Sequence, residues 1–215
     1  MASTSKTPEG RELLFGESRL IISAGSETTS TALTFIFMHL ATHTHYMLAV
    51  RTEFLANLST HTCEQALPML EAVIQESMRM WPSVFFGSQR VTPPQGLEIC
   101  GYFIPGNTIV HIPLFPLFRD PRNFVSPNDF IPERWTTRPE LVRNRAAFIP
   151  FSTGAHNCAG KSLSLMELRS VVGRVVSEFD VVLEEGTDVD AYWEGIKDHF
   201  TAGPPKMMVR FVRTE

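Results

Sequence analysis

The sequence is poor in cysteine and has no long apolar run. Its 215 residues contain three cysteines, Cys63, Cys100 and Cys158, which are too few and too scattered for a disulfide framework. No Cys-x-x-Cys pair is present, and this argues against a structural zinc site. The longest apolar run, Ala32 to Ala41, is far shorter than the roughly 20 residues that a membrane-spanning helix needs. The default expectation is a reducing compartment and no membrane span.

The amino end also lacks an export signal. Residues 1–10 are polar and have no apolar core of the kind that a signal peptide requires. As given, the sequence therefore predicts a cytoplasmic chain without an anchor.

The charge balance and the missing motifs exclude several function classes. The 19 Lys and Arg residues are outnumbered by 23 Asp and Glu, so nothing indicates nucleic-acid binding. There are no internal repeats, no phosphate-binding loop and no Gly-x-Ser-x-Gly hydrolase motif. Six arginines do gather between Arg119 and Arg145, and seven acids between Asp180 and Asp198. Such charge runs are usually solvated faces.

The most informative stretch is a glycine-punctuated loop, Phe-Ser-Thr-Gly-Ala-His-Asn-Cys-Ala-Gly, from Phe151 to Gly160. It runs directly into an amphipathic segment, Lys161 to Phe179, that we expect to be helical. Glycines permit tight turns, and the amino end of a helix favours negative charge. An isolated cysteine is more often a small buried apolar residue, but these surroundings favour a thiolate at Cys158.

The loop resembles the haem-binding loop of the cytochrome P-450 family, Phe-x-x-Gly-x-Arg/His-x-Cys-x-Gly. Phe151, Gly154, His156, Cys158 and Gly160 all match that pattern. The resemblance implies that Cys158 is the axial ligand of the iron of haem b. A thiolate ligand pushes electron density onto the iron and favours O–O cleavage. The resemblance also implies that His156 pairs with a haem propionate; the alternative is an exposed polar loop residue.

A second motif interrupts a predicted helix from Arg11 to about His39. Glycine and threonine in mid-helix are unfavourable, and the stretch Ala-Gly-Ser-Glu-Thr-Thr, alone, would equally fit a solvated polar patch. It also resembles the segment of the family's central helix that crosses the distal face of the haem. The resemblance implies that Ala24 and Gly25 let this helix pass close to the porphyrin. It further implies that Glu27 and Thr28 relay protons to dioxygen.

A third element is an acid and an arginine, Glu76 and Arg79, inside a predicted helix from Gln65 to Trp81. At spacing i, i+3 they are neighbours on one helix face, and as a surface pair they would contribute about 0.2–0.5 kcal/mol. The segment Pro132 to Trp135 resembles the family's Pro-Glu-Arg-Phe element, with tryptophan in place of phenylalanine. The resemblance implies a buried network of Glu76, Arg79 and Arg134 that supports the cysteine loop.

Three histidines, His39, His43 and His45, fall at the start of another predicted helix, which runs to about Leu58. Histidines four residues apart lie on one helix face and can hold a metal. No carboxylate or cysteine nearby in sequence completes such a site. Surface histidines are the favoured interpretation.

Short strands separated by proline and glycine turns are expected between the helical regions. They are Val84 to Phe86, Leu97 to Cys100, Tyr102 to Ile104, Thr108 to Ile112, and short strands between Val181 and Arg213. The segment from Pro113 to Arg145 is expected to be irregular. The resemblance places four residues in a substrate pocket, namely Val84, Phe85, Phe86 and Phe200. Plain core packing is an equal alternative for Phe85 and Phe86.

The predicted fold is therefore mainly α with small β-sheets, an α+β arrangement corresponding to the carboxyl-terminal part of the cytochrome P-450 fold. Residues 1–10 would form a polar tail, and residues 11–215 a partial haem domain that begins at the central helix. The resemblance covers about the carboxyl-terminal half of a typical family member.

The resemblance implies a haem-thiolate monooxygenase that oxidises a small lipophilic molecule with dioxygen and with electrons from an NADPH-dependent flavoprotein reductase. The motif spellings resemble fungal members that act in secondary-metabolite biosynthesis. The alternative is a truncated, non-catalytic remnant of such an enzyme. For a fragment of an anchored family member, the endoplasmic reticulum membrane would be the expected location.

Overall fold

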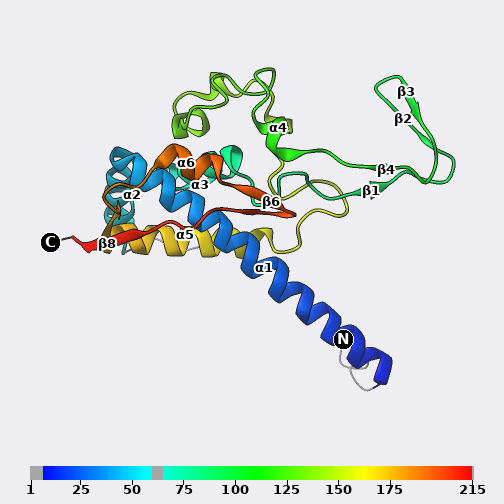
Figure 1. Ribbon diagram of the computed structural model, residues 1–215, viewed down its shortest axis with the longest axis horizontal. Helices are drawn as coiled ribbons and strands as arrows, with labels where there is room; N and C mark the ends of the chain where they lie inside the picture. The colour runs from blue at the N-terminus through cyan, green and yellow to red at the C-terminus, as the bar shows by residue number, and fades with distance from the viewer. Residues whose placement is uncertain (1–6, 60–64, 215) are drawn as a thin grey trace.

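The computed structural model describes residues 7–59 and 65–214, and four longer helices dominate it (Figure 1). These are α1 (Pro8–Thr42), α2 (Thr44–Asn57), α3 (Pro68–Met80) and α5 (Lys161–Glu178). The remaining regular structure is mostly short antiparallel strands. The predicted α+β class is confirmed.

Helix α1 is longer at both ends than the sequence predicted. It begins with a proline, which is favourable in the first turn, and the Thr7 side chain accepts a hydrogen bond from the amide of Gly10 at 3.1 Å. Residues 8–10 of the predicted polar tail therefore belong to α1. Residues 1–6 of that tail, and Cys63, lie outside the described residues.

The main core forms where the carboxyl-terminal half of α1 meets α2, α3 and α5. Ile36, Val50, Leu70 and Leu168 are fully buried there. The ring of Phe54 on α2 lies directly on Gly173 of α5, so a Cβ at this position would overlap the ring. Glycine at position 173 therefore permits the close approach of α2 and α5.

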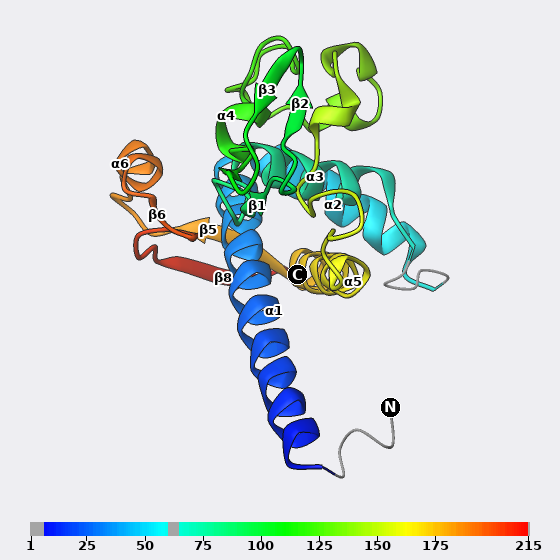
Figure 2. The same cartoon turned by 90° about the vertical axis from the view of Figure 1, so that its right-hand side faces the viewer.

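The amino-terminal half of α1 has a different environment. In Figures 1 and 2 it extends away from the rest of the chain. Six large apolar side chains there are 51–70% exposed, namely Leu13, Leu14, Phe15, Leu20, Ile21 and Ile22. Their positions fall on several sides of the helix, and a helix that is apolar on all sides is ordinarily buried. Across residues 7–59 and 65–214, no helix combines the length and the apolarity needed to cross a membrane.

The strands pair two by two, and every pair is antiparallel in the described part of the chain. The pairs are β1 (Arg90–Val91) with β4 (Ile109–Val110), β2 (Leu97–Ile99) with β3 (Tyr102–Ile104), β5 (Phe179–Leu183) with β8 (Val209–Arg213), and β6 (Lys197–His199) with β7 (Thr201–Gly203). The small antiparallel sheets expected from the sequence are confirmed.

The expected strand at Val84 to Phe86 is wrong. The carbonyl groups in this region bond to other elements instead of a ladder: Phe85 accepts from the amide of Phe115 at 3.0 Å, and Ser83 accepts from the amide of Ala202 at 2.8 Å. The stretch therefore serves as a bend that joins several elements.

Two short helices were not predicted, α4 (Leu114–Phe118) and α6 (Val189–Glu194). The segment predicted to be irregular also contains the 3-10 turns η2 (Pro132–Trp135), η3 (Pro139–Leu141) and η4 (Arg145–Ala147). These elements are too short for hydrophobic periodicity to reveal.

His39 is buried, which contradicts the prediction of a surface histidine. Its side chain is 2% exposed, and its ring stacks on Phe130 at 4.1 Å and on Trp193 at 4.9 Å between ring centres. Both ring nitrogens lack a hydrogen-bond partner in the described part of the structure. The predicted helix around His39 is in fact divided at His43, where α1 ends and α2 begins. Because this stretch of α1 is buried on most sides, its hydrophobic pattern does not separate buried from exposed positions.

The environment of His39 disfavours the imidazolium. Burial is the main cause that lowers the pKa of His39 well below its usual value, and the positive charges of His43, Arg79 and Arg119 lower it further. As the pH falls through about 6.5, the unfolded chain therefore binds a proton at this histidine. The folded chain binds it only at a lower pH. Since the unfolded state binds more protons, stability is present above about pH 6.5 and is lost as the pH falls below it.

We predict that replacing His39 by phenylalanine reduces the loss of stability at low pH, because the aromatic stack is kept while the titrating group is removed. A single such group changes the free energy of unfolding by at most about 1.4 kcal/mol per pH unit. The measurement is urea unfolding between pH 5 and pH 8. The control is the exposed His45→Phe, for which we expect the pH dependence of the unmodified chain. An unchanged slope in His39→Phe would contradict the assignment.

Candidate functional site

The cysteine loop is closed by backbone hydrogen bonds. The amide of Cys158 donates to the carbonyl of Phe151 at 2.9 Å, and the amide of Asn157 donates to the carbonyl of Gly154 at 3.2 Å. Gly154 has a φ of +80°, a conformation that side chains rarely adopt. Phe151 is half-buried and packs against the main core, whereas residues 152–160 are exposed. One end of the loop is thus anchored, and its surface is open.

Cys158 lies three residues before the start of α5 and is exposed and free. Gly160 caps the helix, and a Cβ there would lie 3.9 Å from the Cys158 sulfur, so the thiol sits beside the amino end of α5. Unpaired amides and the positive end of the helix dipole therefore lie beside the sulfur. Among the described residues, no group of three histidine, cysteine or acidic side chains is placed to hold a metal ion.

Arg90 is a residue of this site that sequence reasoning missed. Its Nη2 donates to the carbonyl of His156 at 3.3 Å, so a strand of the β1–β4 pair lies against the loop. Both side chains are exposed. Together they place a guanidinium and an imidazole beside the Cys158 loop. A single arginine in a two-residue strand carries no spacing signal that could have identified it.

Helix α1 crosses α5 close to the cysteine loop. The hydroxyls of Thr29 on α1 and Ser164 in the first turn of α5 are 3.2 Å apart, and Figure 1 shows this crossing near the amino end of α5. The stretch from Ala24 to Thr28 therefore lies at the same end of α5 as Cys158. Gly25 faces open space, since an added Cβ would meet nothing within 4 Å among the described residues.

Glu27 and Thr28 make separate hydrogen bonds. The Thr28 hydroxyl donates to the carbonyl of Ala24 at 2.6 Å, the local back-bonding expected of threonine in a helix. The Glu27 carboxylate accepts from the hydroxyl of Thr201 on β7 at 2.7 Å. The two predicted relay residues are thus adjacent in the chain without bonding to one another.

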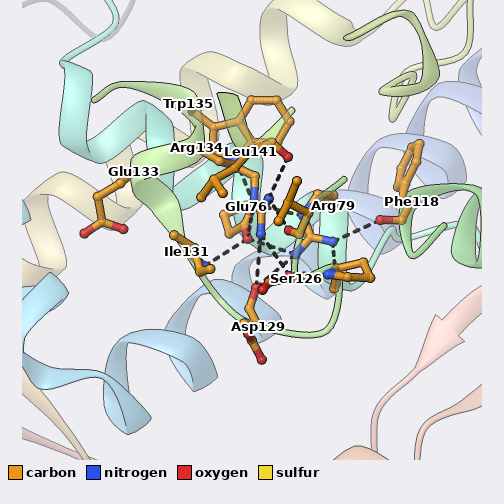
Figure 3. A network of polar contacts seen from close by, with 12 residues as sticks. Glu76, Arg79, Phe118, Ser126, Asp129, Ile131, Glu133, Arg134, Trp135 and Leu141 are labelled. Atoms are coloured by element: carbon orange, nitrogen blue, oxygen red, sulfur yellow. Dashed lines mark hydrogen bonds and ion pairs between the residues drawn. The ribbon is translucent and has the colours of Figure 1, made fainter. Parts of the chain in front are cut away.

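Glu76, Arg79 and Arg134 come together in a fully buried network (Figure 3). Glu76 Oε1 accepts from Arg79 Nη2, from Arg134 Nε and from the amide of Ile131, each at 2.9 Å. Glu76 Oε2 accepts from Arg79 Nε at 3.0 Å and from the indole Nε1 of Trp135 at 2.9 Å. The tryptophan that replaces the family's usual phenylalanine therefore adds a donor to the network.

The two arginines also bind the irregular segment that leads to the cysteine loop. Arg79 donates to the carbonyls of Phe118 at 3.0 Å and Pro127 at 2.7 Å. Arg134 donates to the carbonyls of Val125 at 3.0 Å and Ser126 at 3.2 Å. Burial is the main cause that lowers the pKa of the Arg134 guanidinium. The network thus fixes backbone that lacks regular secondary structure.

The rings of Trp135 and Phe148 are in contact between the Glu76 network and the cysteine loop. Their centres are 4.5 Å apart, and Phe148, like Phe151, packs against the main core. The Glu76 network is thereby connected by a ring contact to Phe148, three residues before the Cys158 loop begins.

The sequence predicted a solvated face for the arginine run from Arg119 to Arg145, but only part of this run is exposed. Arg134 is buried, and Arg119 is half-buried, with its guanidinium stacked on Phe115 at 3.8 Å and on Trp81 at 4.7 Å. Burial lowers the pKa of Arg119 to about 9. The remaining four arginines of the run are exposed: Arg122, Arg138, Arg143 and Arg145.

The four residues predicted to line a substrate pocket have different environments. Phe85 is 8% exposed and packs with Phe35, so core packing holds for it. Val84 is half-buried, whereas Phe86 and Phe200 are 55% and 70% exposed. Phe86 and Phe200 are therefore the members of this set whose rings are exposed.

Comparison with known proteins identifies the family of this chain. The cytochrome P-450 family pattern matches residues 13–211. The chain belongs to the cytochrome P-450 family. The cytochrome P-450 monooxygenase phqL of Penicillium fellutanum is 40% identical over 98% of this chain. The monooxygenase orf5 of Eupenicillium brefeldianum is 40% identical over 93% of it, and the tryprostatin B 6-hydroxylase of Aspergillus fumigatus is 36% identical over 96%.

The chain spans about two fifths of the length of these relatives. It covers 38% of phqL, 41% of orf5 and 38% of the tryprostatin B 6-hydroxylase. The expected membership of the cytochrome P-450 family, its fungal type and the partial coverage are confirmed.

We predict that Glu76→Ala destabilises the chain by about 3–5 kcal/mol, because it leaves Arg79 and Arg134 as buried, uncompensated charges. The measurement is the free energy of unfolding in urea. The control is Glu140→Ala, which breaks an exposed 3.6 Å pair with Arg138 and is expected to cost less than about 1 kcal/mol. Equal costs for the two variants would contradict the supporting role of the network.

Proposed function

We propose that this chain carries the haem-binding site of a haem-thiolate monooxygenase, with Cys158 as the axial ligand of haem b. The observation that carries the proposal is the free, exposed thiol of Cys158 in a closed glycine loop at the amino end of α5. Matching relatives are monooxygenases by name.

The donor set fits a haem better than a bare metal ion. A bare ion such as zinc takes three or four protein ligands, and the described residues contain no such cluster. A porphyrin supplies most of the iron ligands itself, so a single cysteine suffices. His156 would pair with one haem propionate, and Arg90, which bonds to the His156 carbonyl, would add a guanidinium beside it.

Bound haem would supply the activation of dioxygen, and its thiolate ligand favours O–O cleavage. The protein residues would position the haem and supply protons. The single methyl group of Ala24 and the absence of a side chain at Gly25 would leave room for the flat face of the porphyrin. Glu27 would supply protons and the Thr28 hydroxyl would pass them on, after it leaves the carbonyl of Ala24.

The substrate would be a small lipophilic molecule. The exposed rings of Phe86 and Phe200 offer apolar contact surface for it. The tryprostatin B 6-hydroxylase among the relatives favours an oxidation in fungal secondary-metabolite biosynthesis. Dioxygen would be the co-substrate. An NADPH-dependent flavoprotein reductase would supply electrons, and the exposed arginines Arg138, Arg143 and Arg145 would offer its acidic surface a docking face.

A second candidate function is a non-catalytic remnant of such an enzyme. The observation that favours it is the exposed apolar surface on the amino-terminal half of α1, from Leu13 to Ile22. Exposed apolar area costs about 25 cal/mol per Å². The isolated 215-residue chain would then be marginally stable and bind haem weakly, or need a partner chain.

We predict that the haem-loaded chain shows the red-shifted thiolate band in its reduced carbon-monoxide difference spectrum. Cys158→Ser should abolish the band, because a hydroxyl does not replace the thiolate. Cys100→Ser, at the other free and exposed cysteine, is the matched control and should keep the band. A band that survives in Cys158→Ser would contradict the ligand assignment. A well-expressed chain without the band would favour the remnant.

A further inference from the structure

We propose that Thr201 is a positioning residue for the Glu27 carboxylate, and that it connects the β6–β7 hairpin to the acid that supplies protons. The proposal deepens the proposed function and rests on it. The observation that carries it is the 2.7 Å hydrogen bond from the Thr201 hydroxyl to Glu27 Oε1, which joins residues far apart in the sequence.

This bond belongs to a junction of three segments: α1, the residue Ser83 after α3, and β7. The Ser83 hydroxyl donates to the carbonyl of Thr28 at 2.7 Å, and the Ser83 carbonyl accepts from the amide of Ala202 at 2.8 Å. The Thr31 hydroxyl donates to the carbonyl of Ala202 at 3.5 Å. Thr201 is 6% exposed and Ala202 is 2% exposed. The hairpin is therefore fixed to α1 at the turn that carries both relay residues.

The neighbouring residue in the hairpin faces the opposite way. Phe200 is 70% exposed, in contrast to the buried Thr201. It has a φ of +77°, and its amide is held by the Asp198 carboxylate at 2.9 Å. A ligand that packs against the Phe200 ring would act on the backbone of the residue that holds Glu27. A substrate bound against Phe200 would thereby affect the position of the Glu27 carboxylate through the peptide unit that joins Phe200 to Thr201.

A hydroxyl is a suitable partner for an acid that must both lose and regain a proton. The threonine hydroxyl donates to a carboxylate and accepts from a carboxylic acid, so it holds Glu27 in either state. A lysine or arginine in its place would favour only the charged form. Among the described residues, Thr201 provides the side-chain hydrogen bond that the Glu27 carboxylate accepts. Glu27 Oε2 remains available to give a proton to a bridging water and to recover one from solvent, so protons balance.

The first experiment tests the contact and needs no haem. It is a double-mutant cycle with Thr201→Val, Glu27→Ala and the double variant, measured by thermal unfolding. If Thr201 holds Glu27, the double variant melts no lower than the lower-melting single variant. Additive losses in melting temperature would overturn the proposal.

The second experiment tests the role in the haem-loaded chain supplied with reductase and NADPH. Thr201→Val should lower kcat about tenfold or more with an unchanged KM, since only the protonation step loses its positioned acid. The fraction of NADPH consumed that appears as product should fall as well. Thr201→Ser should restore both. The matched control is Thr187→Val, which removes a threonine hydroxyl that bonds to the carbonyl of Glu184, outside this junction, and should leave turnover unchanged.

Turnover in Thr201→Val equal to that of the unmodified chain, or no recovery in Thr201→Ser, would overturn the positioning role. The carbon-monoxide spectrum separates this outcome from failure of the proposed function. Without a thiolate band the proposed function fails, and the double-mutant cycle alone then decides whether Thr201 holds Glu27.

Discussion

The buried carboxylate of Glu76 is the interaction on which the order of this chain depends most. It accepts hydrogen bonds from Arg79, Arg134, Trp135 and the amide of Ile131, and the carboxylate and both guanidinium groups are fully buried. Burying a charge is costly unless it is paired and its remaining hydrogen-bonding positions are satisfied. Here both conditions are met. The arginines also donate hydrogen bonds to backbone carbonyls of a segment that has little regular structure. Side-chain hydrogen bonds thereby take the place of the missing backbone ladder in this segment.

Side-chain packing connects the Glu76 network with the loop that carries the Cys158 thiol. Trp135 contacts Phe148, and Phe148 and Phe151 both pack on the main core, where the cysteine loop begins. The loop then closes on itself through the amide of Cys158. The side of the site that carries the thiol is therefore well supported. The opposite side, on α1, is open, because the helix leaves the core beyond the residues that Ser83 and Thr201 hold.

Much of the site could be predicted from local spacing. The glycines around Cys158 and the Glu76–Arg79 pair at i, i+3 are short-range patterns with a direct physical reason. The partnership with Arg134 came from the family pattern, because it joins residues far apart in the sequence. The Trp135 indole could not be foreseen as a donor, since composition alone does not orient a ring. The bond between Thr201 and Glu27 likewise depends on how a terminal hairpin folds back onto α1.

The errors have a common physical cause. His39 and Arg119 were read as surface residues because polar side chains are usually exposed, but aromatic rings enclose both of them here. Arg90 was missed because a two-residue strand has no periodicity. In each case the determining contact is tertiary, and hydrophobic patterning records only which face of a regular element is buried.

The central claim is that Cys158 is the group that binds haem, and its accessibility provides the most direct measurement. Cys158 and Cys100 are both free and exposed in the structure, so each should react with iodoacetamide in the haem-free chain. The rates can be followed separately by peptide mass spectrometry while haem is added. The account predicts that haem slows the alkylation of Cys158 and leaves the rate at Cys100 unchanged. Equal rates at Cys158 with and without bound haem would contradict it.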